Sequence, residues 1–339
     1  MPILKQTIEK LLDCQNLTRE EAAWALDAIV AEEVTGTEIG AFLIALRMKG
    51  ESIEEITGFV DTMEKHMVKV DLQDGDAIDV CGTGGDAKNS FNVSTTVAII
   101  AAAAGVTVAK HGNRAVSSQC GSTDVLEALG VKIDLGPDQI KKSIDEIKIG
   151  FFFAPMYHPA MKAVVPHRKN LGLRTVFNML GPLLNPARVK RQLIGVFDHE
   201  TSSKLAGVAK AKNYKKVCTV HSADGYDELS PFAENYICEF SESSDEIKKY
   251  NYSYQSSFQT SDLAIGAEPN VNAKIIKSVL SGEKNANREM AVINAGFALY
   301  VSDKVNTVED GIRLAQDTLD NGLARKKLKE LVEVSNSFS

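Results

Sequence analysis

The chain has 339 residues, of which 44% are hydrophobic and 24% charged, and its formal net charge at pH 7 is −7. This composition is ordinary for a globular protein, and the length fits one large α/β domain with a smaller companion. The acidic balance argues against a general nucleic-acid binder, because such a protein needs a basic face.

The first 70 residues have the pattern of helices alone. Apolar residues recur at helical spacing over about 3–12, 22–30, 39–48 and 56–63. Thr18 with Glu21, and Ser52 with Glu55, have the capping-box spacing that begins a helix. We therefore expect a small helical bundle, followed by a polar, turn-rich linker at 71–76.

From residue 77 onward, strand-like and helix-like segments alternate. Alternation of this kind predicts a mainly parallel sheet flanked by helices. Residues 272–281 and 286–336 are again typical of helices, whereas 243–265 have no clear pattern. The predicted strands are 77–81, 106–109, 150–154, 193–197, 217–220 and 236–240, and predicted helices between them include 95–104, 124–129 and 201–212.

The cysteines and the apolar runs favour a cytoplasmic protein. The five cysteines are scattered and form no Cys-x-x-Cys pair, so neither a disulfide framework nor a zinc site is indicated. The N-terminus lacks the apolar stretch of a signal peptide, and the longest apolar run, 97–106, is too short to span a bilayer. We expect a reduced, cytoplasmic protein.

Two loops rich in glycine and hydroxyl groups, 82–86 and 110–124, follow the first two predicted strands. Ligands of open α/β sheets lie beyond the carboxyl ends of the strands, and bare backbone N–H groups there suit an anion. Residues 82–86 match neither the Walker nor the dinucleotide fingerprint, so alone they could be a plain glycine turn. Ser94 or Thr95 would make a good N-cap for the helix that follows. The combination points to a phosphorylated small molecule.

Charged groups near these loops suggest how such a ligand could be held. Lys110 and Arg114 could bind phosphate oxygens, or could form a solvated basic turn. Asp227 and Glu228 follow strand 217–220; beside a phosphate they indicate Mg²⁺, with a hydroxyl such as Ser94, although paired surface acids are common.

Several residues between 158 and 182 also have interpretations in which they take no part in a site. His158 could be a core histidine, Arg168 and Arg174 could be solvated residues of a helix, and the Gly181–Pro182 pair could end a helix.

Taken together, the ordered segments resemble the anthranilate phosphoribosyltransferase family. The matching segments are 82–86, 92–95, 110–114, 121–122, 124–130, 158–161, 174–175, 177–178, 180–183, 185–186 and 227–228. The resemblance implies a glycosyltransferase of tryptophan biosynthesis. It would move the 5-phosphoribosyl group from 5-phosphoribosyl 1-diphosphate (PRPP) to the amine of anthranilate, using two Mg²⁺ ions per subunit.

The same resemblance implies a fold and an assembly. A small α-helical domain would comprise 1–70, with about 167–190 returning to it, and a large α/β domain would comprise 71–166 and 191–339. The family is typically homodimeric through the helical domain. No nucleic-acid or membrane partner is implied.

The resemblance also assigns site residues. Arg168, Lys110 and His111 would be catalytic, and Ser94, Asp227 and Glu228 would hold the metal. Anthranilate would contact Gly82, Asn113, His158, Arg168, Gly181 and Pro182. PRPP would contact Gly82, Gly85, Asp86, Ser90, Asn92, Val93, Ser94, Thr95, Lys110, His111, Gly112, Asn113, Arg114, Ala115, Val116, Ser117, Ser118 and Ser122.

The chain departs from the family pattern at Gln119, Cys120 and Thr123, where the family often has Lys, Ser and Ala. One positive charge is lost there, which bears on donor affinity. Two alternatives remain: a pyrimidine nucleoside phosphorylase, which would need a larger C-terminal region, and a non-catalytic relative that binds nucleic acid, against which the acidic charge argues.

Overall fold

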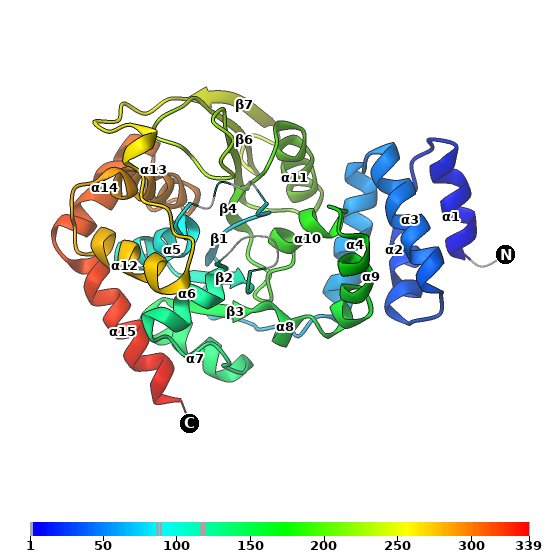
Figure 1. The fold of residues 1–339 in the computed structure, drawn as a ribbon, viewed down its shortest axis with the longest axis horizontal. Helices are drawn as coiled ribbons and strands as arrows, with labels where there is room; N and C mark the ends of the chain where they lie inside the picture. The colour runs from blue at the N-terminus through cyan, green and yellow to red at the C-terminus, as the bar shows by residue number, and fades with distance from the viewer. Residues whose placement is uncertain (1–2, 86–87, 89, 116–119, 339) are drawn as a thin grey trace.

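The computed structural model describes residues 3–85, 88, 90–115 and 120–338. Four helices come first and lie at one end of the molecule (Figure 1). Capping boxes begin three of them, at Thr18, Thr35 and Ser52, so the predicted helix starts at 18 and 52 are confirmed. The helices are α1 (Ile3–Leu12), α2 (Arg19–Val30), α3 (Gly36–Lys49) and α4 (Ile53–His66).

A seven-stranded sheet forms the centre of the rest of the chain. Its strand order is β3-β2-β1-β4-β5-β6-β7, with parallel pairing from β3 to β5 and antiparallel pairing of β6 and β7. This confirms the predicted mainly parallel sheet, although β7 falls in the stretch left without assignment. The strands are β1 (Ile78–Gly82), β2 (Val108–Gly112), β3 (Ile149–Phe153), β4 (Arg191–Gly195), β5 (Lys216–Ser222), β6 (Asn235–Ser241) and β7 (Ile247–Tyr252).

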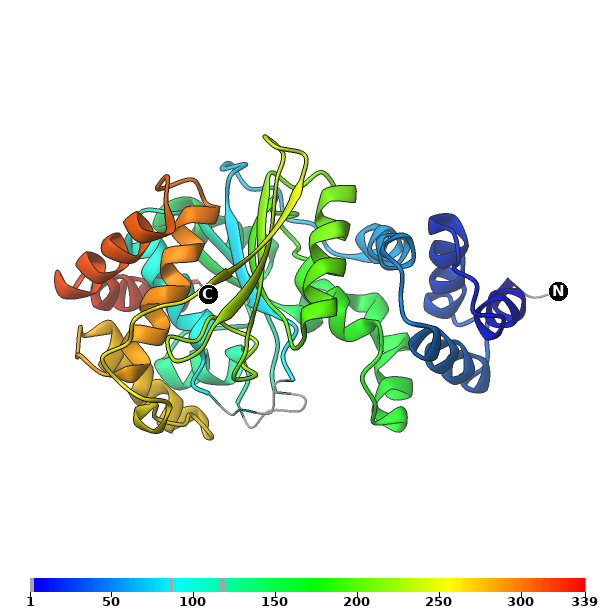
Figure 2. The same ribbon diagram turned by 90° about the horizontal axis from the view of Figure 1, so that it is seen from above.

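Helices cover both faces of the sheet (Figure 2). Strand side chains alternate between the faces, so that Val80 and Val220 pack into one apolar cluster while Ile194 and Val217 pack into another. Along the first face lie α5 (Val93–Ala103), α12 (Pro269–Leu280), α13 (Ala286–Val301), α14 (Val308–Asp320) and α15 (Leu323–Ser337); α11 (His199–Ala211) covers the second. Near β3 lie α6 (Ser122–Leu129) and α7 (Pro137–Ile147).

The segment between β3 and β4 runs back to the N-terminal helices. It contains α8 (Ala154–Tyr157), a 3₁₀ turn (Pro159–Ala163), α9 (Val165–Leu171) and α10 (Phe177–Leu183). The 3₁₀ turn contacts α2 and α4, α9 contacts α3, and α10 contacts α4. Val164 and Phe177 share an apolar cluster with Phe42 and Phe59. The domain boundaries expected from the sequence stay a prediction.

Within the described residues, no helix combines the length and apolarity needed to cross a lipid bilayer. The five cysteines all lie in the described part of the chain and are free thiols.

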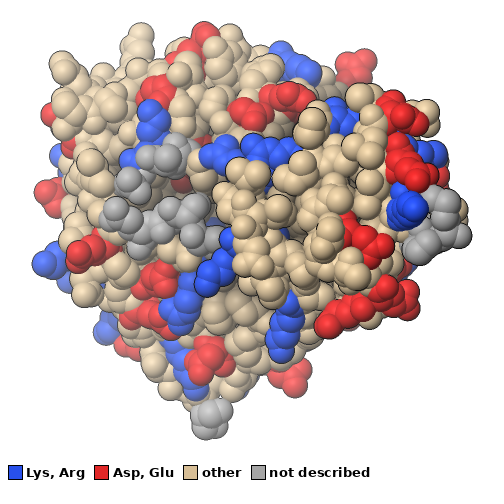
Figure 3. All heavy atoms as spheres, turned by 45° about the vertical axis from the view of Figure 1, so that its right-hand side comes forward, with Lys and Arg blue, Asp and Glu red and all other residues tan. Residues whose placement is uncertain are grey.

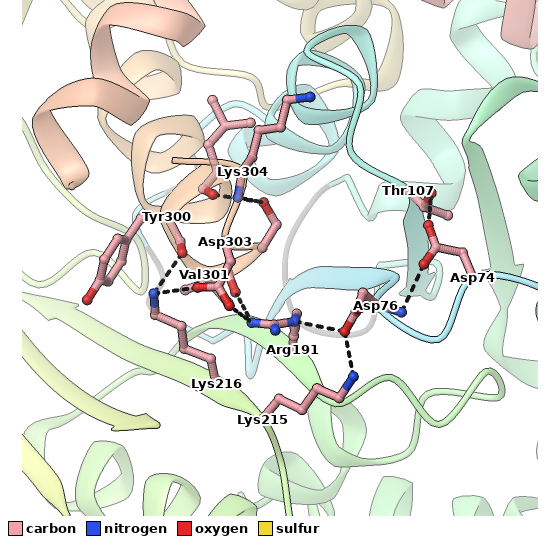
Figure 4. Close-up of polar contacts among 12 residues, drawn as sticks. Asp74, Asp76, Thr107, Arg191, Lys215, Lys216, Tyr300, Val301, Asp303 and Lys304 are labelled. Atoms are coloured by element: carbon pink, nitrogen blue, oxygen red, sulfur yellow. Dashed lines mark hydrogen bonds and ion pairs between the residues drawn. The ribbon is translucent and has the colours of Figure 1, made fainter. Parts of the chain in front are cut away.

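At the amino end of the sheet, Arg191 joins three segments through polar contacts (Figure 4). Its Nε lies 3.2 Å from Asp76 Oδ1, and its Nη1 lies 2.5 Å from Asp303 Oδ2 and donates to the Val301 carbonyl. Lys215 contacts the same Asp76, and Lys216 contacts the same Asp303. The network therefore ties the start of β4 to the linker before β1 and to the end of α13.

We expect Arg191→Ala to lower the free energy of unfolding by about 1–3 kcal/mol, because its partners lose a shared, largely buried donor. The Arg191 side chain is only 12% exposed. The control is Lys284→Ala, whose side chain is 71% exposed beside Asp320 and whose loss costs less than about 0.5 kcal/mol. Urea unfolding of both variants measures the difference, and equal shifts would contradict the expectation.

Candidate functional site

The carboxyl ends of the parallel strands converge on one pocket. Gly82 at the end of β1, Ser94 in α5, and Asp227 with Glu228 after β5 all line it, together with Gly195 at the end of β4. The structure thus brings Gly82, Ser94, Asp227 and Glu228 together from distant parts of the sequence; the family resemblance assigned these four residues to the donor and its metal.

Two glycines allow Asp227 to approach the sheet closely. A Cβ atom on Gly82 would lie 3.2 Å from Asp227 Oδ2, and one on Gly195 would lie 1.7 Å from the Asp227 carbonyl oxygen. Any side chain at 195 would therefore displace the segment that carries the two carboxylates. Sequence reasoning missed Gly195, because nothing in its neighbourhood marks a close contact with residue 227.

Lys110 lies in strand β2, so the predicted end of that strand at residue 109 is wrong. Its side chain is 2% exposed, and its Nζ donates to the Val80 carbonyl at 2.5 Å and to Ser94 Oγ at 3.1 Å. Burial lowers the pKa of Lys110, and the nearby carboxylates of Asp79 and Glu228 oppose that shift. The sheet register therefore places this cation beside the hydroxyl expected to bind metal.

His111, the next residue, lies on the opposite face of the sheet. Its Nε2 is 3.2 Å from His158 Nε2, and its Nδ1 donates to the Gly181 carbonyl at 3.3 Å. Burial lowers the pKa of His111 to about 3 and that of His158 to about 4, so both rings are neutral at pH 7. The structure thus groups three residues that the resemblance assigned to the anthranilate side or to catalysis.

Helices α9 and α10 carry further residues that the resemblance assigned to anthranilate. Gly181 and Pro182 lie in the last turn of α10, which ends at Leu183, so the helix does end next to this pair. Gly181 is exposed, and a Cβ there would meet no atom within 4 Å. In α9, the Arg168 guanidinium lies 5.5 Å from the centre of the Phe177 ring, and partial burial lowers the pKa of Arg168.

The loop after β2 is held by contacts within itself and with α6. Arg114 bonds both carboxylate oxygens of Glu127, at 2.6 and 2.7 Å, and also Asp124 at 3.0 Å. Ala115 N donates to Asp124, and the Ser122 hydroxyl donates to the carbonyl of the exposed Asn113. The Arg114 guanidinium therefore bonds carboxylates of its own chain, whereas the sequence assigned it to phosphate.

The start of α5 differs from the sequence expectation. Asn92 is the N-cap, whereas Ser94 and the fully buried Thr95 lie inside the helix, so the predicted cap is wrong. The backbone N–H of Asn92 donates to Asn272 in α12, and its side-chain amide donates to the Cys120 carbonyl. Val93 is buried as the first helical residue, and Ser90, which precedes the N-cap segment, is half-buried.

The glycine loop after β1 contacts a residue from the segment before α10. Gly85 has a φ of +88°, and its carbonyl accepts a hydrogen bond from the Arg174 guanidinium. The Arg174 carbonyl in turn accepts from Arg47 of α3 at 2.6 Å. Some residues named above lie outside the described residues. They are four that the resemblance assigned to PRPP, Asp86, Val116, Ser117 and Ser118, and also Gln119, where the chain departs from the family pattern.

Comparisons with known proteins match nearly the whole length of the chain. Two family models match: the helical bundle domain of a glycosyl transferase family over residues 5–67, and its a/b domain over 74–325. A relative from Alkaliphilus metalliredigens, named anthranilate phosphoribosyltransferase, is 44% identical over 339 residues, which cover 99% of each chain. The chain belongs to the anthranilate phosphoribosyltransferase family.

Solved structures of the family agree with this assignment. The crystal structure of the enzyme from Thermus thermophilus is 35% identical, with a TM-score of 0.89, and covers 97% of this chain and 99% of that one. The enzyme from Saccharomyces cerevisiae, in complex with PRPP and Mg, is 28% identical with a TM-score of 0.88, covering 99% and 98%. The predicted fold class and the predicted transferase activity are therefore confirmed.

Three buried polar residues were given no role by sequence reasoning, although Asn185 lies in one of the segments that match the family. Asp79 of β1 is fully buried and accepts from Asn185 Nδ2 at 2.8 Å and from the His111 N–H at 3.2 Å. Gln192 of β4 donates to Asp79 and, at 2.5 Å, to the Pro182 carbonyl. Burial raises the pKa of Asp79 against these hydrogen bonds. Polar residues inside apolar strands were the signal that could have identified Asp79 and Gln192.

The neutral histidines predict a pH dependence of stability. Because the folded pKa of His158 lies below the unfolded value of about 6.5, its contribution is complete above that pH and is lost as the pH falls toward 4. Between pH 7 and pH 5, wild type should lose about 2 kcal/mol more unfolding free energy than His158→Gln. Urea unfolding at the two pH values measures this, and parallel losses would contradict it.

Proposed function

We propose that this chain transfers the 5-phosphoribosyl group of PRPP to the amine of anthranilate at the carboxyl edge of its sheet, with release of diphosphate. The observation that carries the proposal is that neighbouring side chains at the end of β2 point to opposite faces of the sheet. Lys110 contacts Ser94 on the α5 side, whereas His111 contacts Gly181 and His158 on the other side. A phosphorylated donor and an aromatic acceptor can therefore meet at neighbouring residues of one strand.

The donor side suits a magnesium-bound diphosphate. Ser94, Asp227 and Glu228 line one pocket, and Mg²⁺ prefers one or two carboxylates with water and substrate phosphate oxygens. The PRPP complex of the yeast relative contains Mg, which supports the same use here. We propose that these three residues hold the metal and that each subunit uses two ions. When bound, Mg²⁺ stabilises negative charge on the departing diphosphate.

The protein adds its own positive groups to the donor side. The first turn of α5 presents backbone N–H groups and the positive end of the helix dipole, which favour phosphate. The Lys110 ammonium lies beside the Ser94 hydroxyl and is buried away from water, so its electrostatic field is only weakly screened there. Both groups stabilise the charge that develops as the diphosphate leaves.

The acceptor side suits a small aromatic carboxylate. The exposed Gly181 leaves space beside the neutral His111 and His158 rings, and Arg168 from α9 holds the carboxylate. The amine of anthranilate is already neutral at pH 7, so the attack needs no strong general base. Two histidines with lowered pKa values are consistent with that requirement.

The assembly and the domain division belong to the same proposal. We propose a small domain of 1–70 with about 167–190, and a homodimer formed through its helices. Leu12 and Met48 support a contact there, because these large apolar side chains are 67% and 83% exposed. On the face shown in Figure 3, Lys and Arg are interspersed with Asp and Glu, which favours small-molecule substrates over nucleic acid.

The activity is tested by following anthranilate fluorescence after addition of PRPP and Mg²⁺. We expect a time-dependent loss with the wild-type chain and a rate that depends on Mg²⁺. The double variant Asp227→Asn, Glu228→Gln should need far more Mg²⁺ for half-maximal rate, because both carboxylate ligands are lost. Constant fluorescence with wild type would refute the activity, and an unchanged Mg²⁺ titration would refute the ligand assignment.

Arg168→Ala should raise the KM for anthranilate at least about tenfold, because loss of a positioned charge-assisted contact typically costs 2–5 kcal/mol. The KM for PRPP should change much less. Lys169→Ala is the matched control, since Lys169 is the exposed next residue of α9. Steady-state kinetics with each substrate varied in turn give both constants. A larger effect on PRPP would remove Arg168 from the acceptor side.

A further inference from the structure

A buried asparagine in α13 holds the chain directly after the two proposed metal carboxylates. Asn294 is 3% exposed and lines the same pocket as Ser94, Asp227 and Glu228. Its Oδ1 accepts from the Leu229 N–H at 3.0 Å, and its Nδ2 donates to the Leu229 carbonyl at 2.8 Å. Nδ2 also donates to the Met290 carbonyl, one turn earlier in α13. Both ends of the amide are therefore committed.

Asparagine is a poor choice for the interior of a helix, because its amide competes with the backbone for hydrogen bonds. Here that amide bonds a segment of chain from outside its helix. The bonded residue follows Glu228 directly, so its backbone position sets the direction from which both carboxylates enter the pocket.

Other contacts hold the chain on either side of Asp227 and Glu228. Before it, Asp224 accepts from the hydroxyls of Ser222 and Ser230, which closes the turn after β5. At Asp227 itself, the absence of a side chain on Gly195 sets how closely the backbone can approach β4. Asn294 adds two directional bonds at the position next to Glu228.

We propose that Asn294 is a positioning residue for the Asp227–Glu228 pair: it holds the Leu229 backbone and so orients the carboxylates toward the magnesium-bound diphosphate. This inference rests on the proposed function. Hydrogen bonds that hold a metal ligand directly typically contribute about 10–100-fold to metal affinity or activity, and this sets the scale for a bond to the neighbouring residue.

The same helix provides a matched control. Asn287 of α13 is also 3% exposed, and it brackets Ala264 in the same way. Its Oδ1 accepts from the Ala264 N–H at 3.0 Å, and its Nδ2 donates to the Ala264 carbonyl at 3.1 Å. Asn294→Ala and Asn287→Ala thus remove equivalent pairs of hydrogen bonds to a backbone residue. The first pair is next to Glu228, whereas the second is at Ala264.

The experiment measures Mn²⁺ binding to each full-length variant by electron paramagnetic resonance, with PRPP present and anthranilate absent, so that no turnover occurs. We expect Asn294→Ala to weaken Mn²⁺ binding about tenfold or more and to raise the Mg²⁺ concentration for half-maximal rate by a similar factor. The KM for anthranilate should stay within about twofold of wild type, and Asn287→Ala should leave Mn²⁺ affinity unchanged.

A second variant tests the proposal if Asn294→Ala does not fold. In Asn294→Ser, the hydroxyl can bond the Met290 carbonyl one turn earlier, so the bond within the helix is kept while the bracket on Leu229 is lost. It should show the same loss of Mn²⁺ affinity. Wild-type affinity in both Asn294 variants, or equal losses in the Asn287 control, would overturn the inference. A wild-type enzyme that consumes anthranilate without binding Mn²⁺ would overturn the metal assignment, and the inference with it.

Discussion

The parallel pairing of β1 with β2 and β4 is the constraint on which the site depends. It sets Gly82, Gly112 and Gly195, which end these strands, along one edge of the sheet. Side chains alternate across a strand, so the register of β2 sends Lys110 to the proposed donor side and His111 to the proposed acceptor side. A slip of one residue would exchange the two groups and bury each among the wrong partners. The division of the site into two halves is thus a property of backbone pairing, before any substrate is considered.

The kinds and order of the elements were predictable because their local signals are strong. Capping boxes and helical spacing mark α2 and α4, and an uninterrupted apolar run marks α5. The end of β2 was not predictable, since Lys110 and His111 look like loop residues until the contacts that bury them are known. β7 was missed for a related reason: with Lys248 and Lys249 exposed at the sheet edge, it lacks an apolar signal.

Only the part of the site that the types of its residues reveal could be predicted from the sequence. Carboxylates, glycines and a cation in a family-like order indicated a magnesium-assisted transfer, and the structure places Ser94 beside Asp227 and Glu228. The supporting residues gave no such signal. Gly195 matters because it has no Cβ atom to clash with the backbone of Asp227. Asn294 matters because its amide bonds the backbone of Leu229, which is far away in the sequence. Contacts of this kind depend on tertiary packing, so one sequence does not reveal them.

The buried polar cluster around Asp79 links the acceptor side to the sheet. An isolated buried carboxylate is costly, and here donors from Asn185, Gln192 and the His111 backbone offset that cost. Gln192 also bonds the Pro182 carbonyl, so α10 is fixed to the strands that carry the donor groups. The described part of the glycine loop, in contrast, is linked to the N-terminal helices through exposed contacts, in which Arg174 bonds Gly85 and Arg47 bonds Arg174. The described part of the glycine loop therefore depends on exposed hydrogen bonds, whereas the position of α10 depends on a buried one.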